Sequence, residues 1–380
     1  MQRFIRGCMG CIVITLVACQ SSRQPIGDRP TEGFSGSTML PETITRSRSA
    51  TPMRPTSLMS SANASAMTKP VLFFDYASDF SEGVAVVRDQ DQFHLIDDTG
   101  TIVLDVDPAL DGVSPFSDQM SLVKVRDFYG YMNRSGTIIV APQYTSATPF
   151  SEGLAAVRTG TKYGYINAAG ELIIEPQFDL ATGFVDGKAS ARLNDQYGYI
   201  NTDGTWAIAP QYEDNGQFSE QLAAVRLNRK WGYVDESGEE VIPQTLDGAF
   251  TFADHRARVR VGPDWGFIAP TGAFVVEPTF AFASDFSEGL AAVMVGTKWG
   301  YINADGAMAI DPQFDYAANF SEGLAAVQLD GKYGFITSSG EWLIQPEYSN
   351  VGQFSEGFAW VQMDQQRSYI DVEGVLLHSP

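Results

Sequence analysis

Serine and histidine are residue types that can perform nucleophilic catalysis when their spacing brings them together. A serine nucleophile needs one base within reach. Ser-Glu-Gly recurs at 81–83, 151–153, 287–289, 321–323 and 355–357. The histidines of the later part of the chain fall at non-equivalent positions, His94, His255 and His378. Repeated copies without a histidine indicate turns, and we predict no catalytic residue.

Metal ligands are equally sparse. The chain has three cysteines and three histidines, too few for a Cys/His cluster of familiar spacing. Asp105, Asp107 and Asp111 lie close together and could coordinate Ca²⁺, but they lack the spaced Asp/Asn-Gly loop of a defined calcium motif. Solvated loop carboxylates are the favoured interpretation, and neither a metal nor a cofactor is predicted.

An arginine cluster offers a different chemistry, the binding of anionic and aromatic groups. Arg256, Arg258 and Arg260 alternate onto one face of an expected strand, and Trp265 follows them. Guanidinium beside an aromatic ring is a common composition of binding contacts. A face that holds two arginines is expected to lie beside solvent, because an unpaired buried charge is costly. These four residues are the candidate partner-binding site.

Basic residues also recur at the equivalent strand end in six consecutive repeats: Arg88, Lys124, Arg158, Arg192, Arg226 and Arg260. Two interpretations stay open for this basic ladder. The favoured one pairs each base with the acidic residue six positions upstream, Glu82, Asp118, Glu152, Asp186, Glu220 or Asp254. The other is a cationic track for an anionic glycan, a polymer or an acidic protein segment.

The N-terminus indicates export. Arg3 and Arg6 precede an apolar run, 7–18, that is too short to span a bilayer and is typical of a secretory signal. The run ends in Leu16-Val17-Ala18-Cys19, which resembles the lipobox of bacterial lipoproteins. The resemblance implies cleavage before Cys19 and acylation of Cys19, which would anchor the protein to a bilayer. Gln20 in place of aspartate favours the outer membrane, with the protein facing the periplasm or the surface.

Composition divides the rest of the chain in two. Residues 19–70 are rich in Ser, Thr and Pro and have no periodicity, so a disordered tether is expected there. Residues 71–380 are expected to fold, because 44% of the whole chain is hydrophobic. The 46 acidic residues against 25 basic ones give a net charge of −21, which argues against a nucleic-acid partner.

The folded part contains nine copies of one repeat motif. A phenylalanine opens each unit at Phe80, Phe116, Phe150, Phe184, Phe218, Phe252, Phe286, Phe320 and Phe354. The fullest form reads F-S-E-G-L-A-A-V, then K-(Y/W)-G-(Y/F)-I-N, then a glycine turn and I-x-P-Q-(F/Y). A spacing of about 34 residues with almost no insertions predicts an array in which neighbouring units cover one another.

These units resemble the bacterial WG-repeat (KWG-repeat) family. The aromatic-glycine pairs that carry the resemblance are Tyr129-Gly130, Tyr163-Gly164, Tyr197-Gly198, Trp231-Gly232, Trp265-Gly266, Trp299-Gly300 and Tyr333-Gly334. The resemblance implies β-structured repeats, mostly without an assigned function.

Each unit is expected to be a three-stranded β-meander, since short β-prone stretches alternate with glycine turns. Helical repeats are excluded because glycine or proline interrupts every few residues. Phe93-His94 and Arg367-Ser368 replace the aromatic-glycine pair in the outermost units and suggest caps. Nine units exceed the usual four to eight propeller blades. We therefore expect an all-β, open, curved or superhelical array, with a closed toroid or propeller-like ring as the alternative.

The function expected from the sequence is a lipid-anchored envelope protein whose repeat domain binds a protein or glycan partner as a scaffold. The competing class is an enzyme, such as a hydrolase of cell-wall polymers. A scaffold distributes its contacts over many similar units, whereas an enzyme has one unit with a unique polar cluster. No unit holds such a cluster in the sequence.

Overall fold

The structure, a computed structural model, describes residues 69–380. This part contains 34 β-strands and no helix, so the expected all-β class is confirmed. None of its elements is a helix long and apolar enough to cross a membrane. The signal segment, Cys19 and the tether lie outside the described residues.

The strands form nine antiparallel sheets, called blades 1 to 9 in chain order. Blade 1 contains β1 (Tyr76–Ala77), β2 (Ala85–Asp89), β3 (Gln92–Ile96) and β4 (Ile102–Asp105). Blade 2 contains β5 (Gly112–Ser117), β6 (Met120–Val125), β7 (Phe128–Asn133) and β8 (Ile138–Tyr144). Blade 3 contains β9 (Leu154–Thr159), β10 (Lys162–Asn167) and β11 (Leu172–Phe178).

Blades 4 to 6 follow the same order. Blade 4 contains β12 (Leu180–Ala181), β13 (Lys188–Leu193), β14 (Gln196–Asn201) and β15 (Trp206–Tyr212). Blade 5 contains β16 (Asp214–Asn215), β17 (Leu222–Leu227), β18 (Lys230–Asp235) and β19 (Glu240–Leu246). Blade 6 contains β20 (Gly248–Ala253), β21 (Arg256–Val261), β22 (Asp264–Ile268) and β23 (Phe274–Phe280).

Blades 7 to 9 complete the set. Blade 7 contains β24 (Phe282–Ala283), β25 (Leu290–Val295), β26 (Lys298–Asn303) and β27 (Met308–Phe314). Blade 8 contains β28 (Tyr316–Ala317), β29 (Leu324–Leu329), β30 (Lys332–Thr337) and β31 (Trp342–Tyr348). Blade 9 contains β32 (Asn350–Val351), β33 (Phe358–Met363) and β34 (Gln366–Asp371).

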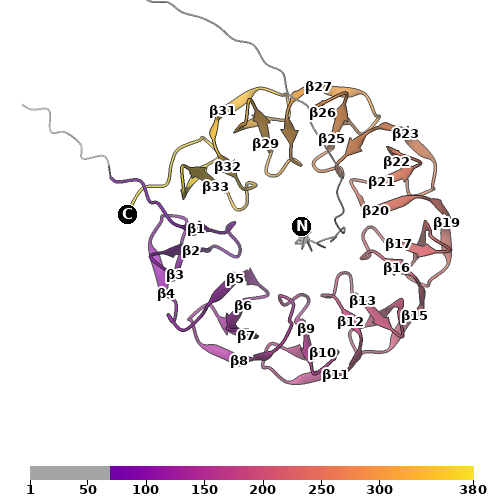
Figure 1. The fold of residues 1–380 in the computed structure, drawn as a ribbon, viewed down its shortest axis with the longest axis horizontal. Helices are drawn as coiled ribbons and strands as arrows, with labels where there is room; N and C mark the ends of the chain where they lie inside the picture. Colours follow the sequence, from indigo (N-terminus) through magenta and orange to yellow (C-terminus); the bar gives the residue numbers. More distant parts are fainter. Residues whose placement is uncertain (1–68) are drawn as a thin grey trace, which may run out of the picture. The chain divides into compact units, whose positions relative to one another are not determined.

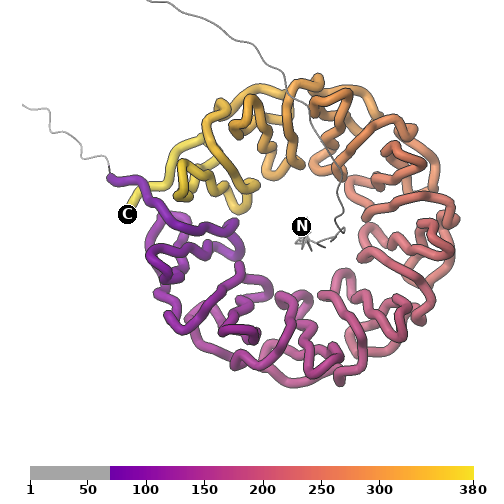
Figure 2. The backbone as a smooth tube through the Cα atoms, in the orientation of Figure 1, coloured from indigo at the N-terminus to yellow at the C-terminus, as the bar shows by residue number. Residues whose placement is uncertain are grey.

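The nine blades of the folded part close into a ring (Figures 1 and 2). The favoured expectation of an open array is therefore wrong, and the alternative of a propeller-like ring is confirmed. The three long strands of the meander were predicted correctly for blades 1 to 8, whereas blade 9 has two, β33 and β34. A fourth, short strand precedes them in most blades and was missed, because two residues such as Leu180–Ala181 give no periodic signal. The last long strand of a blade lies at the perimeter of the ring (Figure 1).

The outermost repeats join each other and do not cap open ends. We call this junction, between the N-terminal residues 69–78 and blade 9, the seam. Phe74 pairs with Arg367 of β34 through two backbone hydrogen bonds of 2.8 Å, and Val71 pairs with His378. The N-terminal segment thus occupies the outer edge of blade 9, where a Pro-Gln-aromatic strand stands in other blades. Both ends of the described chain therefore contribute to one sheet.

The core lies between blades. In β9, Ala155 and Val157 pack with Tyr131 of blade 2, while Leu154 and Ala156 pack towards blade 4. All four residues are buried. The ring therefore covers both faces of this strand.

The Ser-Glu-Gly turns join neighbouring blades. Ser151 Oγ donates to the carbonyl oxygen of Phe184 at 2.6 Å, and Glu152 accepts the backbone N–H of Gly187 at 2.9 Å. Such a carboxylate contact spans eight of the nine junctions among the described blades. The junction between blades 9 and 1 is one of them, since Glu356 accepts the N–H of Gly83 at 2.7 Å. The turns therefore hold blades together in addition to reversing the chain.

The glycine of the aromatic-glycine pair is required by a close backbone approach. In β14, a Cβ on Gly198 would lie 2.4 Å from the carbonyl oxygen of Ile208 and 2.8 Å from the nitrogen of Pro210. The pairing of β14 with β15 is irregular at this point. Equivalent contacts of 2.3–2.5 Å occur at Gly130, Gly164, Gly232, Gly266, Gly300 and Gly334.

Gly198→Ala is expected to lower the free energy of unfolding by about 3 kcal/mol, because a methyl group there must displace backbone rather than a flexible side chain. Gly183→Ala is the matched control, since its Cβ would meet only Ser151 Cβ at an ordinary 3.5 Å. Urea unfolding of both variants measures the difference. Equal stability of the two would contradict this account of the glycine.

Candidate functional site

A pocket of about 520 Å³ lies between blades 5 and 6, which we call the blade 5–6 pocket. Its lining is formed by Gly216, Ala224, Trp231, Asp247, Gly248, Ala249, Phe250, Thr251, Arg260 and Trp265. The volume is within the range of ligand sites, roughly 300–1,000 Å³. Aromatic rings and an arginine, which are part of this lining, are common in binding contacts.

The predicted partner-binding residues divide between the pocket and its support. Arg260 and Trp265 line the pocket, with the guanidinium carbon 5.7 Å from the indole centroid. Arg256 does not line it, and donates to the carbonyl oxygens of Ala304 at 3.3 Å and His255 at 2.8 Å. Partner binding by these residues stays a prediction.

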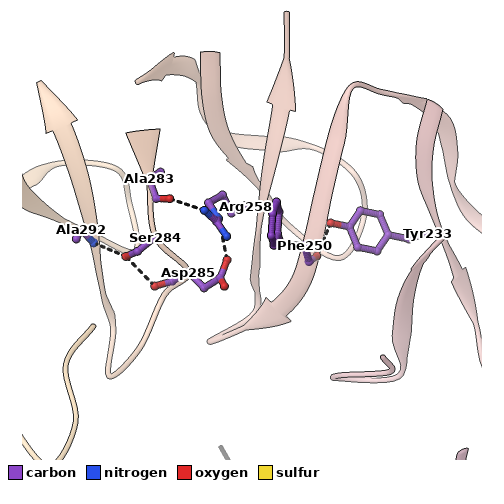
Figure 3. Close-up of polar contacts among 7 residues, drawn as sticks. All are labelled: Tyr233, Phe250, Arg258, Ala283, Ser284, Asp285 and Ala292. Atoms are coloured by element: carbon purple, nitrogen blue, oxygen red, sulfur yellow. Dashed lines mark hydrogen bonds and ion pairs between the residues drawn. The ribbon is translucent and has the colours of Figure 1, made fainter. Parts of the chain in front are cut away.

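Arg258 lies behind the pocket and holds blade 6 against blade 7 (Figure 3). Its Nε donates to Asp285 Oδ1 at 3.0 Å, and Nη1 donates to the carbonyl oxygen of Ala283 at 2.6 Å. The guanidinium also lies 3.9 Å from the ring centroid of Phe250. The side chain of Arg258 is only 17% exposed, so the expectation that it faces solvent is wrong.

Arg258→Ala is expected to lower the free energy of unfolding by about 2 kcal/mol, because Asp285 would lose its partner at a half-buried site. Arg256→Leu should leave stability nearly unchanged, since that side chain makes no ion pair within the described residues. Thermal unfolding of each single variant, with Asp285→Ala and the double variant to complete a cycle, gives the coupling energy. If the changes in the free energy of unfolding of the two single variants add up to that of the double variant, Arg258 and Asp285 do not interact.

Five of the six bases of the ladder, all but Arg158, lie over aromatic rings and are not paired with the upstream acids. Arg192, for example, lies 5.8 Å from the ring centroid of Tyr197 in the same blade. Equivalent pairs are Arg88–Phe93, Lys124–Tyr129, Arg226–Trp231 and Arg260–Trp265. No ladder base within the described residues forms an ion pair with the acid six positions upstream. The favoured pairing is therefore wrong, because most of those carboxylates accept backbone N–H groups of the next blade.

The carboxylate of Asp247, at the pocket wall, already accepts hydrogen bonds from other groups of the protein. Its Oδ1 accepts from Lys230 Nζ at 2.5 Å, and its Oδ2 accepts from the N–H of Gly262 at 2.7 Å. The hydrogen bond from Lys230, followed by that from Gly262, lowers the pKa of Asp247. Arg260 donates only to the backbone oxygen of Asp247, at 3.3 Å, and no carboxylate among residues 69–380 lies within ion-pair distance of it. Arg260 is thus the cation of this pocket with donors to spare.

The other chemistry-bearing residues are dispersed. His94 Nδ1 lies 2.8 Å from Asp105 Oδ1 in blade 1, whereas His255 Nδ1 lies 3.1 Å from Glu220 Oε2 at the junction of blades 5 and 6. Asp107 accepts the N–H of Ala109, and Asp111 accepts that of Arg126. In residues 69–380 no cluster of three such side chains could hold a metal ion.

Sequence reasoning missed Gly248 and Phe250, which shape the pocket. Every other repeat has a small residue at the position of Phe250: Ser78, Ser114, Thr148, Thr182, Gly216, Ser284, Ala318 and Gly352. Comparing the repeats at this position would have singled out blade 6. The signal was present, but it lies in the short strand that precedes the recognised motif.

A closed ring of nine four-stranded or three-stranded sheets defines a β-propeller, a fold commonly used as a binding scaffold. The chain belongs to the WG-containing repeat family, whose model matches residues 74–92, 129–163, 163–197, 197–231, 231–262, 265–299, 299–333 and 333–366. These matches cover more than half of the chain, so the proposed resemblance is confirmed.

Solved structures with a similar fold have little sequence in common with this chain. The crystal structure of the eukaryotic initiation factor shares 10% identity over 75% of this chain and 89% of that chain, with a TM-score of 0.55. BamB from Moraxella catarrhalis shares 13% identity over 68% of this chain and 97% of that chain, with a TM-score of 0.41. No curated protein matches the sequence. At these identities the likeness concerns the fold alone.

Proposed function

We propose that the protein is a lipid-anchored envelope protein whose propeller is a non-catalytic binding scaffold for a protein or glycan partner. The observation that supports the scaffold is the blade 5–6 pocket, an aromatic recess with an unpaired arginine on a ring of mutually joined blades. A recess built on rigid strands holds its walls in place before a partner arrives, which reduces the ordering cost of binding. The support for the anchor is the lipobox-like sequence that ends at Cys19.

The scaffold is tested by site-specific photo-crosslinking in the native envelope. A photoreactive residue at Thr251, which lines the pocket, should trap the same partner reproducibly, whereas one at the exposed Thr99 of blade 1 should not. The partner is then purified and its affinity for the full chain is measured. An equal yield at both positions, or a trapped molecule that the purified protein converts to a product, would contradict a binding role for the pocket.

The anchor is tested separately. Cys19→Ser is expected to give a soluble or an unprocessed protein without acyl chains, whereas the wild type partitions into detergent, because each buried CH₂ of the acyl chains contributes about 0.8 kcal/mol to membrane binding. Phase partitioning and mass spectrometry of the N-terminal peptide measure this change. An unmodified Cys19 in the mature wild-type protein would remove the anchor and leave the scaffold unaffected.

A further inference from the structure

In blade 8 a tyrosine fills the space between the signature aromatics of adjacent blades. Tyr316 of β28 lies between Trp299 of blade 7 and Tyr333 of blade 8. Its ring centroid is 6.4 Å from that of Trp299 and 6.1 Å from that of Tyr333. Both distances fall in the range of favourable aromatic contacts. This space therefore accepts a planar aromatic ring.

Blade 6 has a glycine at the equivalent position. Gly248 lies between Trp231 and Trp265, and the three residues line the blade 5–6 pocket. The backbone of Gly248 does not have the positive φ that would call for glycine. Its consequence is the missing side chain, so the position that Tyr316 fills in blade 8 is bordered here by the Arg260 side chain, with Nε 3.6 Å from the Cβ position, and by Trp265, with Cη2 at 3.8 Å. Gly112 of blade 2 also lacks a side chain, but it lies between repeats that carry Phe93 and Tyr129 instead of two tryptophans.

One lining residue of the pocket, Phe250, has an aromatic ring that is held in contact with Arg258. Phe250 lies 5.5 Å from Trp265, centroid to centroid, and Arg258 lies against it at 3.9 Å. Because Asp285 holds Arg258 in turn, Phe250 is kept in place without a ligand (Figure 3). A ring entering between Trp231 and Trp265 would thus meet apolar surface on several sides.

Arg260 adds a requirement for negative charge at the rim. It pairs across the sheet with Gly248 in the register of β20 and β21, so no side chain at position 248 covers it. In blade 8 the equivalent residue is Gln328, opposite Tyr316. Blade 6 thus exchanges a tyrosine and a glutamine for an open slot and a guanidinium, which binds carboxylates through paired hydrogen bonds.

We infer that the blade 5–6 pocket binds an aromatic side chain of a partner protein, with a neighbouring carboxylate of the same segment on Arg260. The inference rests on the proposed scaffold function and names the chemistry of its partner. The bound ring would take the place that Tyr316 has in blade 8, between two signature aromatics. Arg260 would select segments in which aspartate or glutamate flanks the aromatic residue.

The test is calorimetric titration of the full chain with acetyl-Glu-Tyr-Glu-amide. Replacing the tyrosine of the peptide by alanine should weaken binding at least about tenfold, because the buried ring is lost. Replacing both glutamates by glutamine should weaken binding less and remove most of its salt dependence. A free aromatic acid, 4-hydroxyphenylacetate, tests whether ring and carboxylate alone suffice. Tighter binding of this acid than of the peptide would overturn the assignment to a protein segment.

Two variants transfer the blade 8 residues into blade 6. Gly248→Tyr should fill the slot and lower peptide affinity at least about tenfold. Its Cβ would lie 3.3 Å from Arg260 Cβ, so the two strands must separate by a few tenths of an ångström, and the melting temperature is measured alongside to show that the variant is folded. Arg260→Gln should abolish the preference for glutamate over glutamine in the peptide. Gly112→Tyr is the matched control at the same position of blade 2 and should leave affinity unchanged.

Equal affinity of wild type and Gly248→Tyr for the peptide would overturn the inference. So would binding of chito-oligosaccharide, rather than peptide, that is lost in Gly248→Tyr. Failure of the proposed function is distinguishable from failure of this inference. If Gly248→Tyr still crosslinks its envelope partner through Thr251, the scaffold stands and the aromatic slot is wrong. If neither protein crosslinks a partner, the scaffold fails at this site.

Discussion

Raising the pH above about 10 is expected to unfold the propeller in one cooperative step. Six buried tyrosines donate their hydroxyl groups to carbonyl oxygens of the next blade: Tyr131, Tyr165, Tyr199, Tyr233, Tyr301 and Tyr369. Burial raises the pKa of each of these phenols above its usual value of 10.0. The folded ring therefore keeps protons that the unfolded chain releases.

The direction and the size of the change in the free energy of unfolding follow from this difference in bound protons. Stability from a raised pKa is fully present below the unfolded value of about 10 and is lost as the pH rises towards the folded value. Each tyrosine contributes a loss of about 1.4 kcal/mol per pH unit above 10, so six tyrosines remove on the order of 8 kcal/mol by pH 11. That equals a large part of the stability of a typical domain, about 5–15 kcal/mol.

Blades 6 and 8 supply the control, because Phe267 and Phe335 occupy the tyrosine position there. Tyr165→Phe should cost about 1 kcal/mol at pH 7, for the lost hydrogen bond to Thr182. It should also make the stability less dependent on pH between 10 and 11. The measurement is tyrosinate absorbance recorded together with circular dichroism. Gradual ionisation of these tyrosines without loss of β-structure would contradict the prediction.

The sequence predicted the blades well because their determinants are local. Alternating residues such as Ala155 and Val157, and turn glycines such as Gly170, lie within one unit and repeat at a fixed spacing. Closure of the ring was predicted only as the alternative to an open array, because it depends on residues about 290 positions apart, such as Arg367 and Ala77. No repeat pattern records that relation, and the degenerate ends resembled caps.

The sequence predicted only part of the candidate site, because the surroundings of its arginines depend on residues of other repeats. Charge singled out Arg258 and Arg260 equally, yet their strand places one between blades and the other at the pocket. The cost of burying a charge predicted solvent for Arg258, but Asp285 of the next blade removes that cost. Its partner is 27 residues away and belongs to a different repeat, so the pairing within one unit that was considered from the sequence could not include it.

Removing the N-terminal half of the seam is expected to destabilise the propeller by roughly 5 kcal/mol. A chain that begins at Asp79 lacks Phe74, whose buried ring contributes about 1.5–3 kcal/mol. It also lacks the carbonyl oxygens of Ala77 and Ser78, which accept from Arg367 at 2.9 Å and from Tyr369 at 2.6 Å. The buried hydroxyl of Tyr369 would lose its partner, at a cost of about 1–3 kcal/mol.

The matched control begins at Lys69 and keeps the whole seam. It should unfold at the same temperature as the full chain, whereas the chain that begins at Asp79 should unfold well below it. A synthetic peptide of residues 69–78 added to the shorter chain should restore part of the difference, in proportion to its concentration. Coincident melting of both truncated chains would show that the seam contributes nothing to stability.

The blades in which hydrogen exchange accelerates distinguish a closed ring from an open stack. Ser355 and Glu356 still reach Phe80 and Gly83 in the shorter chain, so the junction of blades 9 and 1 is weakened rather than abolished. Since each blade contacts its neighbours, hydrogen exchange should accelerate first in blades 9 and 1 and least in blade 5. In a stack without closure, loss of residues 69–78 would accelerate exchange in blade 1 alone. Faster exchange in β33 and β34, nearly 300 residues from the truncation, is therefore the specific signature of closure.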